Sequence, residues 1–275
     1  MFPETAAEQD RLARTLRRLV LQAGAETLCR FRRTDRHDAV KPDGSPVSDA
    51  DLAANRVIVA GLAAAWPGVP TVAEEGGGIA PSDWEAPFFL VDPLDGTKEY
   101  IRGGEDFTVN IALVVARRPV MGAVFAPASG LLFWTPRPGV AIEETGGDPE
   151  RIGSLSPLTC RKADPAALSV LLSRSHCDRA TLDYAARYAP ADTRHLGSSL
   201  KFCLIARGEA DLHPRFGPTM EWDTAAGHAV LAAAGGRVTA LDTDRPLLYG
   251  KPGLRNPFFV ASGPGIGISP LAGRP

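Results

Sequence analysis

The sequence predicts an α/β protein with an α+β first lobe, residues 1–150, and an α/β second lobe, residues 151–275. Apolar residues make up 44% of the 275 residues, which is enough for a sizeable core in one large domain or two packed lobes. In the first half, short apolar runs separated by Pro and Gly follow one another, as in an antiparallel meander. In the second half, strand-like and helix-like segments alternate, which is typical of α/β architecture.

Two helices are predicted near the N-terminus. Residues 4–31 form the first, because Leu12, Leu16 and Leu19 recur at helical spacing with arginines between them. The second begins at Ser48 and Asp49, and Ser48 with Asp51 three positions later resembles a capping box. Between the helices, a Lys-Pro-Asp-Gly turn separates two short extended pieces.

The strands of the first lobe follow from apolar runs bounded by turn residues. They are expected at 69–73, 88–91, 107–115, 120–125, 131–134 and 140–143. The polar, Gly-containing segment 146–157 is the predicted boundary between the lobes. The second lobe is expected to contain strands at 169–172, 211–213, 237–239 and 258–261, and helices at 181–188, 198–207 and 222–234.

Composition bounds the function classes. The formal net charge of −2 argues against a nucleic-acid-binding surface. The four cysteines are scattered without a Cys-x-x-Cys pair, which favours a reducing compartment and free thiols. No apolar run approaches transmembrane length, and charged residues occupy the place of a signal-peptide core. We therefore expect a soluble, cytoplasmic protein. The five histidines lack metal-ligand spacing, so a zinc site is not expected.

Acidic residues stand at the ends of several predicted elements. Asp92 and Asp95 follow an apolar strand on a turn fixed by Pro93 and Gly96, where ligands usually bind in α/β sheets. Taken alone, this turn has an ordinary structural explanation. Glu74 and Glu75 end another strand, however, and Asp223 stands at a helix start. Because clustered carboxylates repel each other unless a cation holds them, we interpret these acids as a site for a hard cation.

Four motifs, in their order along the chain, resemble those of the inositol monophosphatase superfamily of magnesium-dependent, lithium-sensitive phosphatases. The motifs are EEGG, DPLDGTKEYI with DFTVNIAL, GSSLKFC, and WDTAAGHAVLAAAGG, and they cover nearly the whole chain. The Lys98-Glu99 pair is similar to that of the 3′(2′),5′-bisphosphate nucleotidase branch. These enzymes remove the 3′-phosphate of adenosine 3′,5′-bisphosphate. The resemblance implies a layered α/β/α/β/α sandwich of the sugar-phosphatase type.

The same resemblance implies which residues act. The implied metal ligands are the carboxylates of Glu74, Asp92, Asp95 and Asp223 and the carbonyl of Leu94, which would hold two or three Mg²⁺ ions. Asp49 and Thr97 match the pair that orients the attacking water. Glu75 is the weaker choice of the two adjacent glutamates.

Further residues are expected to contact a small phosphate substrate. They are Lys41, Gly96, Thr97, His176, Ser198, Lys201 and Arg215. Lys201, Ser198 and Arg215 would bind the second phosphate of a bisphosphate nucleotide, because hydroxyls, helix N-termini and guanidinium groups suit anions. His176 would stack on adenine. A surface lysine and a loop arginine are the ordinary structural alternative.

Several alternatives remain open. Within the superfamily they are inositol monophosphatase and fructose-1,6-bisphosphatase activity, and outside it a non-catalytic nucleotide-binding protein. An aspartyl-phosphate mechanism is disfavoured, because that class uses acids two positions apart whereas Asp92 and Asp95 are three apart. The partner expectation is a small-molecule phosphate, with no nucleic acid and no membrane span, in a monomer or a homodimer.

Overall fold

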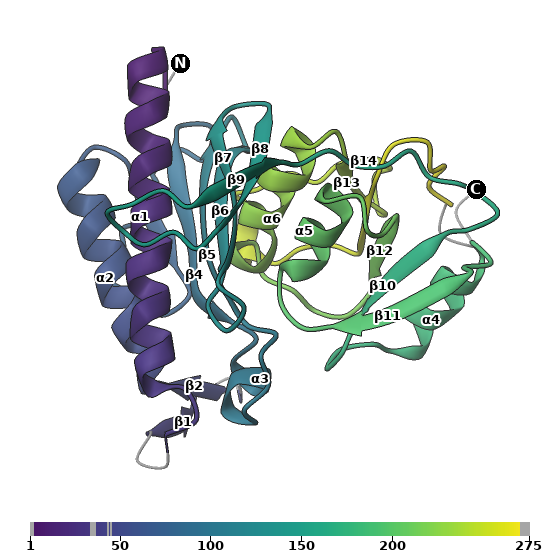
Figure 1. The fold of residues 1–275 in the computed structure, drawn as a ribbon, viewed down its shortest axis with the longest axis horizontal. Helices are drawn as coiled ribbons and strands as arrows, with labels where there is room; N and C mark the ends of the chain where they lie inside the picture. Colours follow the sequence, from purple (N-terminus) through teal and green to yellow (C-terminus); the bar gives the residue numbers. More distant parts are fainter. Residues whose placement is uncertain (1–2, 34–36, 43, 45, 270–275) are drawn as a thin grey trace.

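Five layers, in the order helix, sheet, helix, sheet, helix, make up the computed structural model (Figure 1), which describes residues 3–33, 37–42, 44 and 46–269. α1 (Ala6–Arg30) and α2 (Asp49–Ala65) cover the outer face of the first sheet. α5 (Leu200–Ala206) and α6 (Trp222–Ala233) lie between the two sheets, and α4 (Arg179–Ala186) covers the far face of the second. The predicted layered sandwich is confirmed.

The first sheet has strand order β3-β4-β5-β6-β7-β8-β9. Its strands are β3 (Thr71–Ala73), β4 (Phe88–Asp95), β5 (Thr108–Val115), β6 (Arg118–Ala126), β7 (Leu131–Arg137), β8 (Val140–Thr145) and β9 (Ser154–Pro157). β3 pairs with β4 in parallel, and every later pair is antiparallel, so the predicted meander is present.

The second sheet is mixed, with strand order β11-β10-β12-β15-β13-β14. Its strands are β10 (Ser169–Ser173), β11 (Asp192–Leu196), β12 (Leu212–Arg215), β13 (Arg237–Ala240), β14 (Arg245–Pro246) and β15 (Phe259–Ser262). β10 runs parallel to both of its neighbours, while β15 is antiparallel to β12 and β13. A hairpin of β1 (Asp38–Val40) and β2 (Pro46–Ser48) lies beside the start of α2.

The helix starts follow from local capping. Thr5 and Glu8 form a reciprocal capping box at α1. The predicted box at α2 is also present: the Ser48 hydroxyl accepts from the backbone of Asp51, and the Asp51 carboxylate accepts from the backbone of Ser48. This box folds the Asp51 side chain back over the start of α2.

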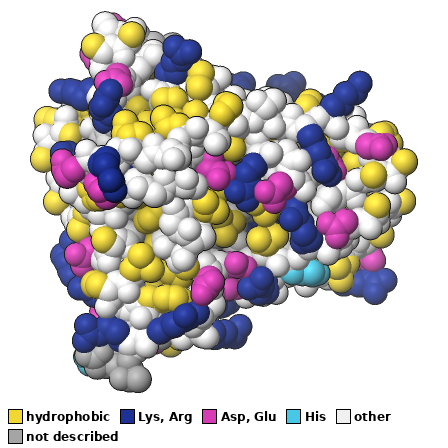
Figure 2. All heavy atoms as spheres, in the orientation of Figure 1, with side chains coloured by type: hydrophobic (Ala, Val, Ile, Leu, Met, Phe, Trp, Pro, Cys, Tyr) yellow, Lys and Arg dark blue, Asp and Glu magenta, His cyan; other side chains and the backbone are white. Residues whose placement is uncertain are grey.

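Four buried apolar clusters occur among the described residues, and three of them hold the layers together. One joins α1 and α2 to the first sheet, a second fills the space around α5 and α6, and a third lies under α4. In β5 every residue is buried, because helices cover both faces of this central strand. On the face seen in Figure 2, basic and acidic side chains are interspersed.

Some elements differ from the expectation. β4 continues through Asp95 with an irregular register after Asp92, so the two acids lie within the strand end rather than on a separate turn. α3 (Thr97–Ile101), β9, β11 and β14 were not predicted. β9 lies beyond residue 150 but pairs with β8, so the first sheet extends past the predicted boundary between the lobes. The division of the chain into two lobes stays a prediction. Asp43, part of the expected hairpin turn, lies outside the described residues.

No helix within the described ranges combines the length and the apolar character needed to cross a bilayer. All four cysteines are free thiols, as expected. The cytoplasmic location inferred from them remains a prediction.

A buried ion pair joins the first layer to the first sheet, and it gives a stability prediction. Arg17 of α1 donates to Glu144 of β8 at 2.5 and 2.7 Å, and both side chains are at most 4% exposed. Arg17→Met should lower the free energy of unfolding by roughly 3 kcal/mol or more, because Glu144 would stay buried without its cation. Chemical denaturation measures this change. Arg14→Met is the matched control: its pair with Asp10 is exposed, so little change is expected. Equal effects of the two variants would contradict the prediction.

Candidate active site

A cavity of about 460 Å³ opens between the end of the first sheet and the end of the second. Its walls come from β4, α3, β12 and the starts of α5 and α6. The predicted site residues that line it are Lys41, Glu74, Asp92, Leu94, Asp95, Gly96, Thr97, His176, Ser198, Lys201, Arg215 and Asp223. Segments far apart in the sequence therefore meet here, and Asp49 is the predicted site residue that does not line the cavity.

The end of β4 positions two of the carboxylates. The Leu94 backbone N–H donates to Asp92 Oδ1 at 3.0 Å, which fixes that side chain. Gly96 then has φ of 91°, and a Cβ at this position would lie 2.8 Å from the Asp106 carbonyl oxygen. Only glycine allows the chain to turn this tightly from β4 into α3. The turn places Thr97 beside the two aspartates.

Asp223 reaches the cavity from the first turn of α6. The Met220 backbone N–H donates to its Oδ2 at 2.9 Å. Two residues earlier, Glu221 anchors the start of α6. It is fully buried and accepts from the backbone N–H groups of Gly250 and Lys251. The Lys251 ammonium lies 2.6 Å from the same carboxylate. Glu221 is thus fully occupied in holding the helix start, and Asp223 is left facing the cavity.

The three aspartates form an unfavourable cluster of charge. Burial, together with the neighbouring acids, raises the pKa of Asp92 and of Asp223 well above the ordinary value. Burial also raises the pKa of Asp95 to about 6, although the nearby Lys201 ammonium acts in the opposite direction. Buried carboxylates that repel each other are compensated by a hard cation with a preference for oxygen ligands. The donor set therefore fits Mg²⁺.

Glu74 contacts a lysine and also lies near Asp92, whose pKa is raised by burial and then by the Glu74 charge. Lys41 Nζ lies 2.8 Å from Glu74 Oε1 and also donates to Glu75. Burial alone would lower the lysine pKa, but these two carboxylates raise it. Within the described residues, no three His, Cys, Asp or Glu side chains converge closely enough to enclose a metal ion. The assignment of Glu74 as a ligand stays a prediction.

The partner predicted for Thr97 was wrong. Thr97 Oγ1 lies 3.1 Å from Asp51 Oδ1 and 3.0 Å from the Leu94 carbonyl oxygen. Asp51 is 1% exposed, and burial raises its pKa. Its other oxygen, Oδ2, accepts from the hydroxyl and the backbone N–H of Ser48. Asp51, and not Asp49, is the acid that faces Thr97.

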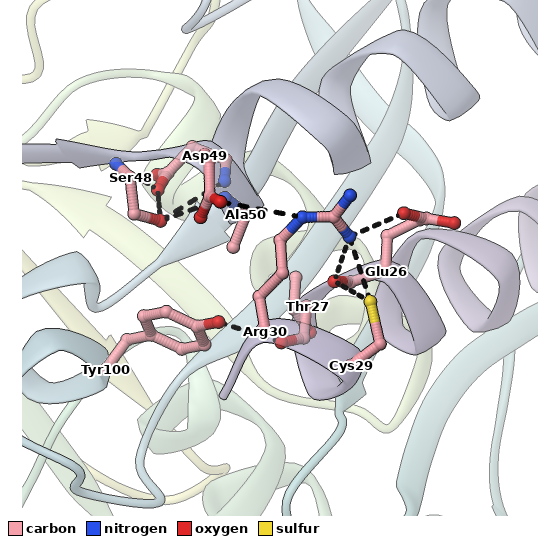
Figure 3. Close-up of polar contacts among 9 residues, drawn as sticks. Glu26, Thr27, Cys29, Arg30, Ser48, Asp49, Ala50 and Tyr100 are labelled. Atoms are coloured by element: carbon pink, nitrogen blue, oxygen red, sulfur yellow. Dashed lines mark hydrogen bonds and ion pairs between the residues drawn. The ribbon is translucent and has the colours of Figure 1, made fainter. Parts of the chain in front are cut away.

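Asp49 points to the other side of the helix start. Its Oδ2 lies 3.9 Å from Arg30 Nε, near the end of α1, and Figure 3 shows the Arg30 guanidinium between Asp49 on one side and Glu26 and Cys29 on the other. Successive residues in the first helical turn project about 100° apart, so acids two positions apart face different neighbours. The Ser48 cap was recognisable in the sequence, but the cap did not reveal which of the two acids faces Thr97.

Basic side chains line the wall opposite the carboxylates. Lys201 is 5% and Arg215 is 6% exposed. Lys201 Nζ donates to the carbonyls of Leu196 and Ser198, and burial lowers its pKa to about 8. Arg215 donates to the carbonyls of His176 and Pro218, while its buried Nε has no hydrogen-bond partner in the described part of the chain. These cations hold the surrounding loops and also give the cavity a positive wall.

His176 and Ser198 lie on the same wall. Burial, and then the Arg215 charge, lowers the pKa of His176, which favours a neutral ring near pH 7. Ser198 has a left-handed backbone, with φ of 51°, and its buried Oγ has no partner among the described residues. An unpaired buried hydroxyl in a cavity wall is suited to a ligand.

Some residues of this site were not predicted from the sequence. Glu99, also in the cavity wall, accepts a hydrogen bond from Ser175 and so joins α3 to the loop that carries His176. Trp222 and His213 also line the cavity. Glu99 and Trp222 lie within the motifs of the family resemblance, but neither was assigned to the site, because their contacts come from segments distant in the sequence.

The raised carboxylate pKa values predict a pH-dependent response to cations. The pKa of Asp95 is about 6 in the folded chain, against an ordinary value of about 4. This shift stabilises the fold below about pH 4, and the stabilisation is lost as the pH rises through about 6. Mg²⁺ competes with protons for the same oxygens. It should therefore raise the melting temperature more at pH 8 than at pH 5, as measured by thermal unfolding with and without Mg²⁺. A shift in melting temperature that is equal at both pH values, or larger at pH 5, would contradict this prediction.

Comparison with known proteins gives a consistent result. The model of the inositol monophosphatase family matches residues 8–263. The 3′(2′),5′-bisphosphate nucleotidase CysQ of Escherichia coli strain K12 is 44% identical over 203 residues, which are 72% of this chain and 77% of that protein. The protein of the same name from Salmonella typhimurium is 44% identical over 205 residues, covering 73% and 78% of the two chains.

Solved structures agree in fold. The crystal structure of CysQ from Bacteroides thetaiotaomicron, described as a bacterial member of the inositol monophosphatase family, superimposes with a TM-score of 0.76. It is 33% identical, and the match covers 92% of this chain and 97% of the other. An IMPase from Thermotoga maritima has a TM-score of 0.71 at 23% identity, with 92% of each chain covered, which supports the fold alone.

Proposed function

The chain belongs to the inositol monophosphatase family, and we propose that within it this protein is a magnesium-dependent 3′(2′),5′-bisphosphate nucleotidase. The substrate is adenosine 3′,5′-bisphosphate, and its sulfated 3′-phosphoadenosine form belongs to the same chemical class. One observation carries the proposal: a single cavity joins a cluster of buried carboxylates to a wall of buried cations. The carboxylate cluster is suited to cation-assisted cleavage of one phosphate, and the wall of cations is suited to binding a second phosphate of the same substrate.

The acids of the cavity hold the cation. Asp92, Asp95, Asp223 and Glu74, with the Leu94 carbonyl, would be its oxygen ligands. Bound Mg²⁺ would supply a Lewis acid that stabilises charge on the phosphoryl group and activates water near neutral pH. The chain keeps these ligands in place through the Leu94 and Met220 backbone donors described above.

Thr97 and Asp51 act on the water. A hydroxyl can accept a hydrogen bond from water while donating its own proton to a carboxylate. Asp51 accepts from Thr97 at 3.1 Å, so the pair forms a short proton path away from the cavity. Asp51 thereby orients Thr97 and takes the place that Asp49 was expected to have. The attacking water, aligned by Thr97, would displace the ribose oxygen without a phosphoenzyme.

The second phosphate meets the cationic wall. Ser198 Oγ and Arg215 Nε supply unused donors, and Lys201 supplies charge. His176, neutral near pH 7, is available to stack on adenine, and Lys41 and Gly96 lie near the phosphate that is cleaved. Location in the cytoplasm and assembly as a monomer or homodimer remain predictions.

A substrate panel tests the proposal. Phosphate release in Mg²⁺ should be fastest from adenosine 3′,5′-bisphosphate and its sulfated form, and slower from inositol monophosphate and fructose 1,6-bisphosphate. A preference for inositol monophosphate or for fructose 1,6-bisphosphate would assign the chain to another activity of its family. Nucleotide binding without phosphate release would support a non-catalytic role.

Removing the cationic wall should affect substrates unequally. A charged hydrogen bond to phosphate contributes about 1.5–3 kcal/mol, so Lys201→Ala or Arg215→Ala should raise KM for adenosine 3′,5′-bisphosphate by about tenfold or more. Inositol monophosphate lacks the second phosphate and serves as the internal control, with a much smaller change expected. Steady-state kinetics on both substrates measures the difference. Equal losses would mean that these residues support the fold instead.

A further inference from the structure

Three buried polar side chains meet where β5 contacts the start of α5, and the proposed chemistry uses none of them. Thr108 and Asn110 belong to β5, and Ser199 precedes α5; each is at most 1% exposed. The Thr108 and Ser199 hydroxyls lie 2.9 Å apart, Ser199 Oγ donates to Asn110 Oδ1 at 2.7 Å, and Asn110 Nδ2 donates to Thr108 Oγ1 at 3.2 Å. The three residues, here called the polar triad, close a ring of hydrogen bonds.

The polar triad lies directly beside the metal-ligand strand. In the pairing of β4 with β5, Asn110 is opposite Asp92 and Thr108 is opposite Asp95. The Ser199 backbone amide also faces the Asp95 carboxylate, where it partly offsets the rise in pKa that burial causes. A shift of Asp95 therefore reaches Thr108 through the strand pairing, and it reaches Ser199 through the hydrogen bond between the Thr108 and Ser199 hydroxyls.

On its other side, the polar triad holds the turn that carries the anion-binding residues. Gly197 N–H donates to Asp106 Oδ2 at 3.1 Å, and a Cβ on Gly197 would lie 2.6 Å from the Asp106 carbonyl oxygen. Ser198 stands between the two docked residues with its left-handed backbone, and its carbonyl accepts from Lys201. A strained residue keeps its conformation only where its neighbours fix it. Here Gly197 and Ser199 are those neighbours.

Apolar packing could join the same two segments at lower cost, since buried polar groups are expensive unless fully paired. A fully paired ring instead defines one relative position of the turn and the strand. This position sets Ser198 and Lys201 with respect to Asp92 and Asp95.

We propose that Ser199 is a positioning residue that couples the carboxylate cluster to the anion subsite. Cation binding between Asp92 and Asp95 fixes Ser199 and so presents Ser198 and Lys201 to the second phosphate; by linkage, a bound phosphate strengthens cation binding to the same degree. The inference rests on the proposed nucleotidase function.

Calorimetric titration of adenosine 5′-monophosphate into the full chain tests the coupling without turnover. This nucleotide is the product of the proposed reaction and retains only the distant phosphate. Saturating Mg²⁺ should tighten its binding to the wild type by about fivefold or more, within the usual range of such couplings. Ser199→Ala should reduce this ratio to below about twofold, because the ring of hydrogen bonds is opened. Thr108→Val removes one hydroxyl of the ring with little change of shape, and the ratio should fall with it.

Thr135→Val is the matched control. Its hydroxyl is also buried in the first sheet and hydrogen-bonds to the backbone of Gly122, so its loss removes a comparable contact away from the polar triad. This variant should keep the wild-type ratio. If Ser199→Ala fails to fold, Thr108→Val decides the question.

The outcomes separate the two proposals. A wild-type ratio near one, a ratio unchanged in Ser199→Ala or Thr108→Val, or an equal loss in Thr135→Val would overturn the coupling. If wild type hydrolyses adenosine 3′,5′-bisphosphate in those cases, the nucleotidase function stands. If wild type neither binds the monophosphate nor hydrolyses the bisphosphate, both proposals fail.

Discussion

The Asp92→Asn variant is expected to lose about 10⁴-fold in kcat/KM. At 1.36 kcal/mol per tenfold, this loss corresponds to about 5 kcal/mol of transition-state stabilisation. Several kcal/mol is what a metal ion supplies to a phosphoryl group. Asp92 is fully buried at the end of β4, among Glu74, Asp95 and Asp223. An amide in its place keeps the acceptor for the Leu94 N–H but removes the negative charge that binds the ion.

The same variant should be more stable than wild type in the absence of divalent cations. Burial and the neighbouring acids raise the pKa of Asp92, so its ionised form opposes folding near neutral pH. The neutral amide removes that repulsion. Thermal unfolding in a chelator should therefore give a higher melting temperature for Asp92→Asn, and addition of Mg²⁺ should raise it less than in wild type. A variant with wild-type turnover at ordinary Mg²⁺ concentration would show that Asp92 is not a ligand.

The Asp51→Asn variant should lose about 10²–10⁴-fold in kcat, the usual contribution of a positioned proton acceptor. An amide cannot take up the proton that Thr97 passes on, although it fits the same space. Thr97→Val should cause a similar loss. The double variant should be little worse than either single one, because the two groups act as one unit.

Asp49→Asn is the matched control for Asp51, since it makes the same chemical change two residues away. Asp49 faces Arg30 at 3.9 Å and not the cavity, so kcat should change by no more than about twofold, as at most surface positions. Initial-rate measurements over a range of pH compare the variants. A large loss in Asp49→Asn with normal activity in Asp51→Asn would restore the original assignment and contradict the geometry.

The coupling role of Ser199 adds a constraint on how these variants are interpreted. Thr108, which is hydrogen-bonded to Ser199, lies opposite Asp95 in the sheet, and the Ser199 backbone amide faces the Asp95 carboxylate. A change at Asp95 is thus expected to alter nucleotide binding as well as cation binding. Asp223 lies on α6 without a contact to the polar triad in the described residues, so its substitution should affect chiefly the cation.

The sequence by itself predicted the meander of the first lobe and the α/β second lobe, and its family resemblance implied the layered sandwich and most residues of the cavity wall. The 3.6-residue apolar period of α1 and the successive apolar runs of the meander are local signals, and they are sufficient because each element buries one continuous face. The acids at the ends of β4 and at the start of α6 were recognisable because charge at a buried element end has few structural explanations.

Only the tertiary structure decided which side chains face each other. Asp49 and Asp51 are the same residue type in the same helical turn, so no local property of the sequence separates them. Their neighbours do: Arg30 of α1 lies near Asp49, and Thr97 lies near Asp51. Ser199 likewise has the composition of an ordinary helix start until β5 supplies Thr108 and Asn110. Hydrogen bonds between segments nearly 50 to 90 residues apart depend on how the layers pack, and that packing is a property of the whole chain.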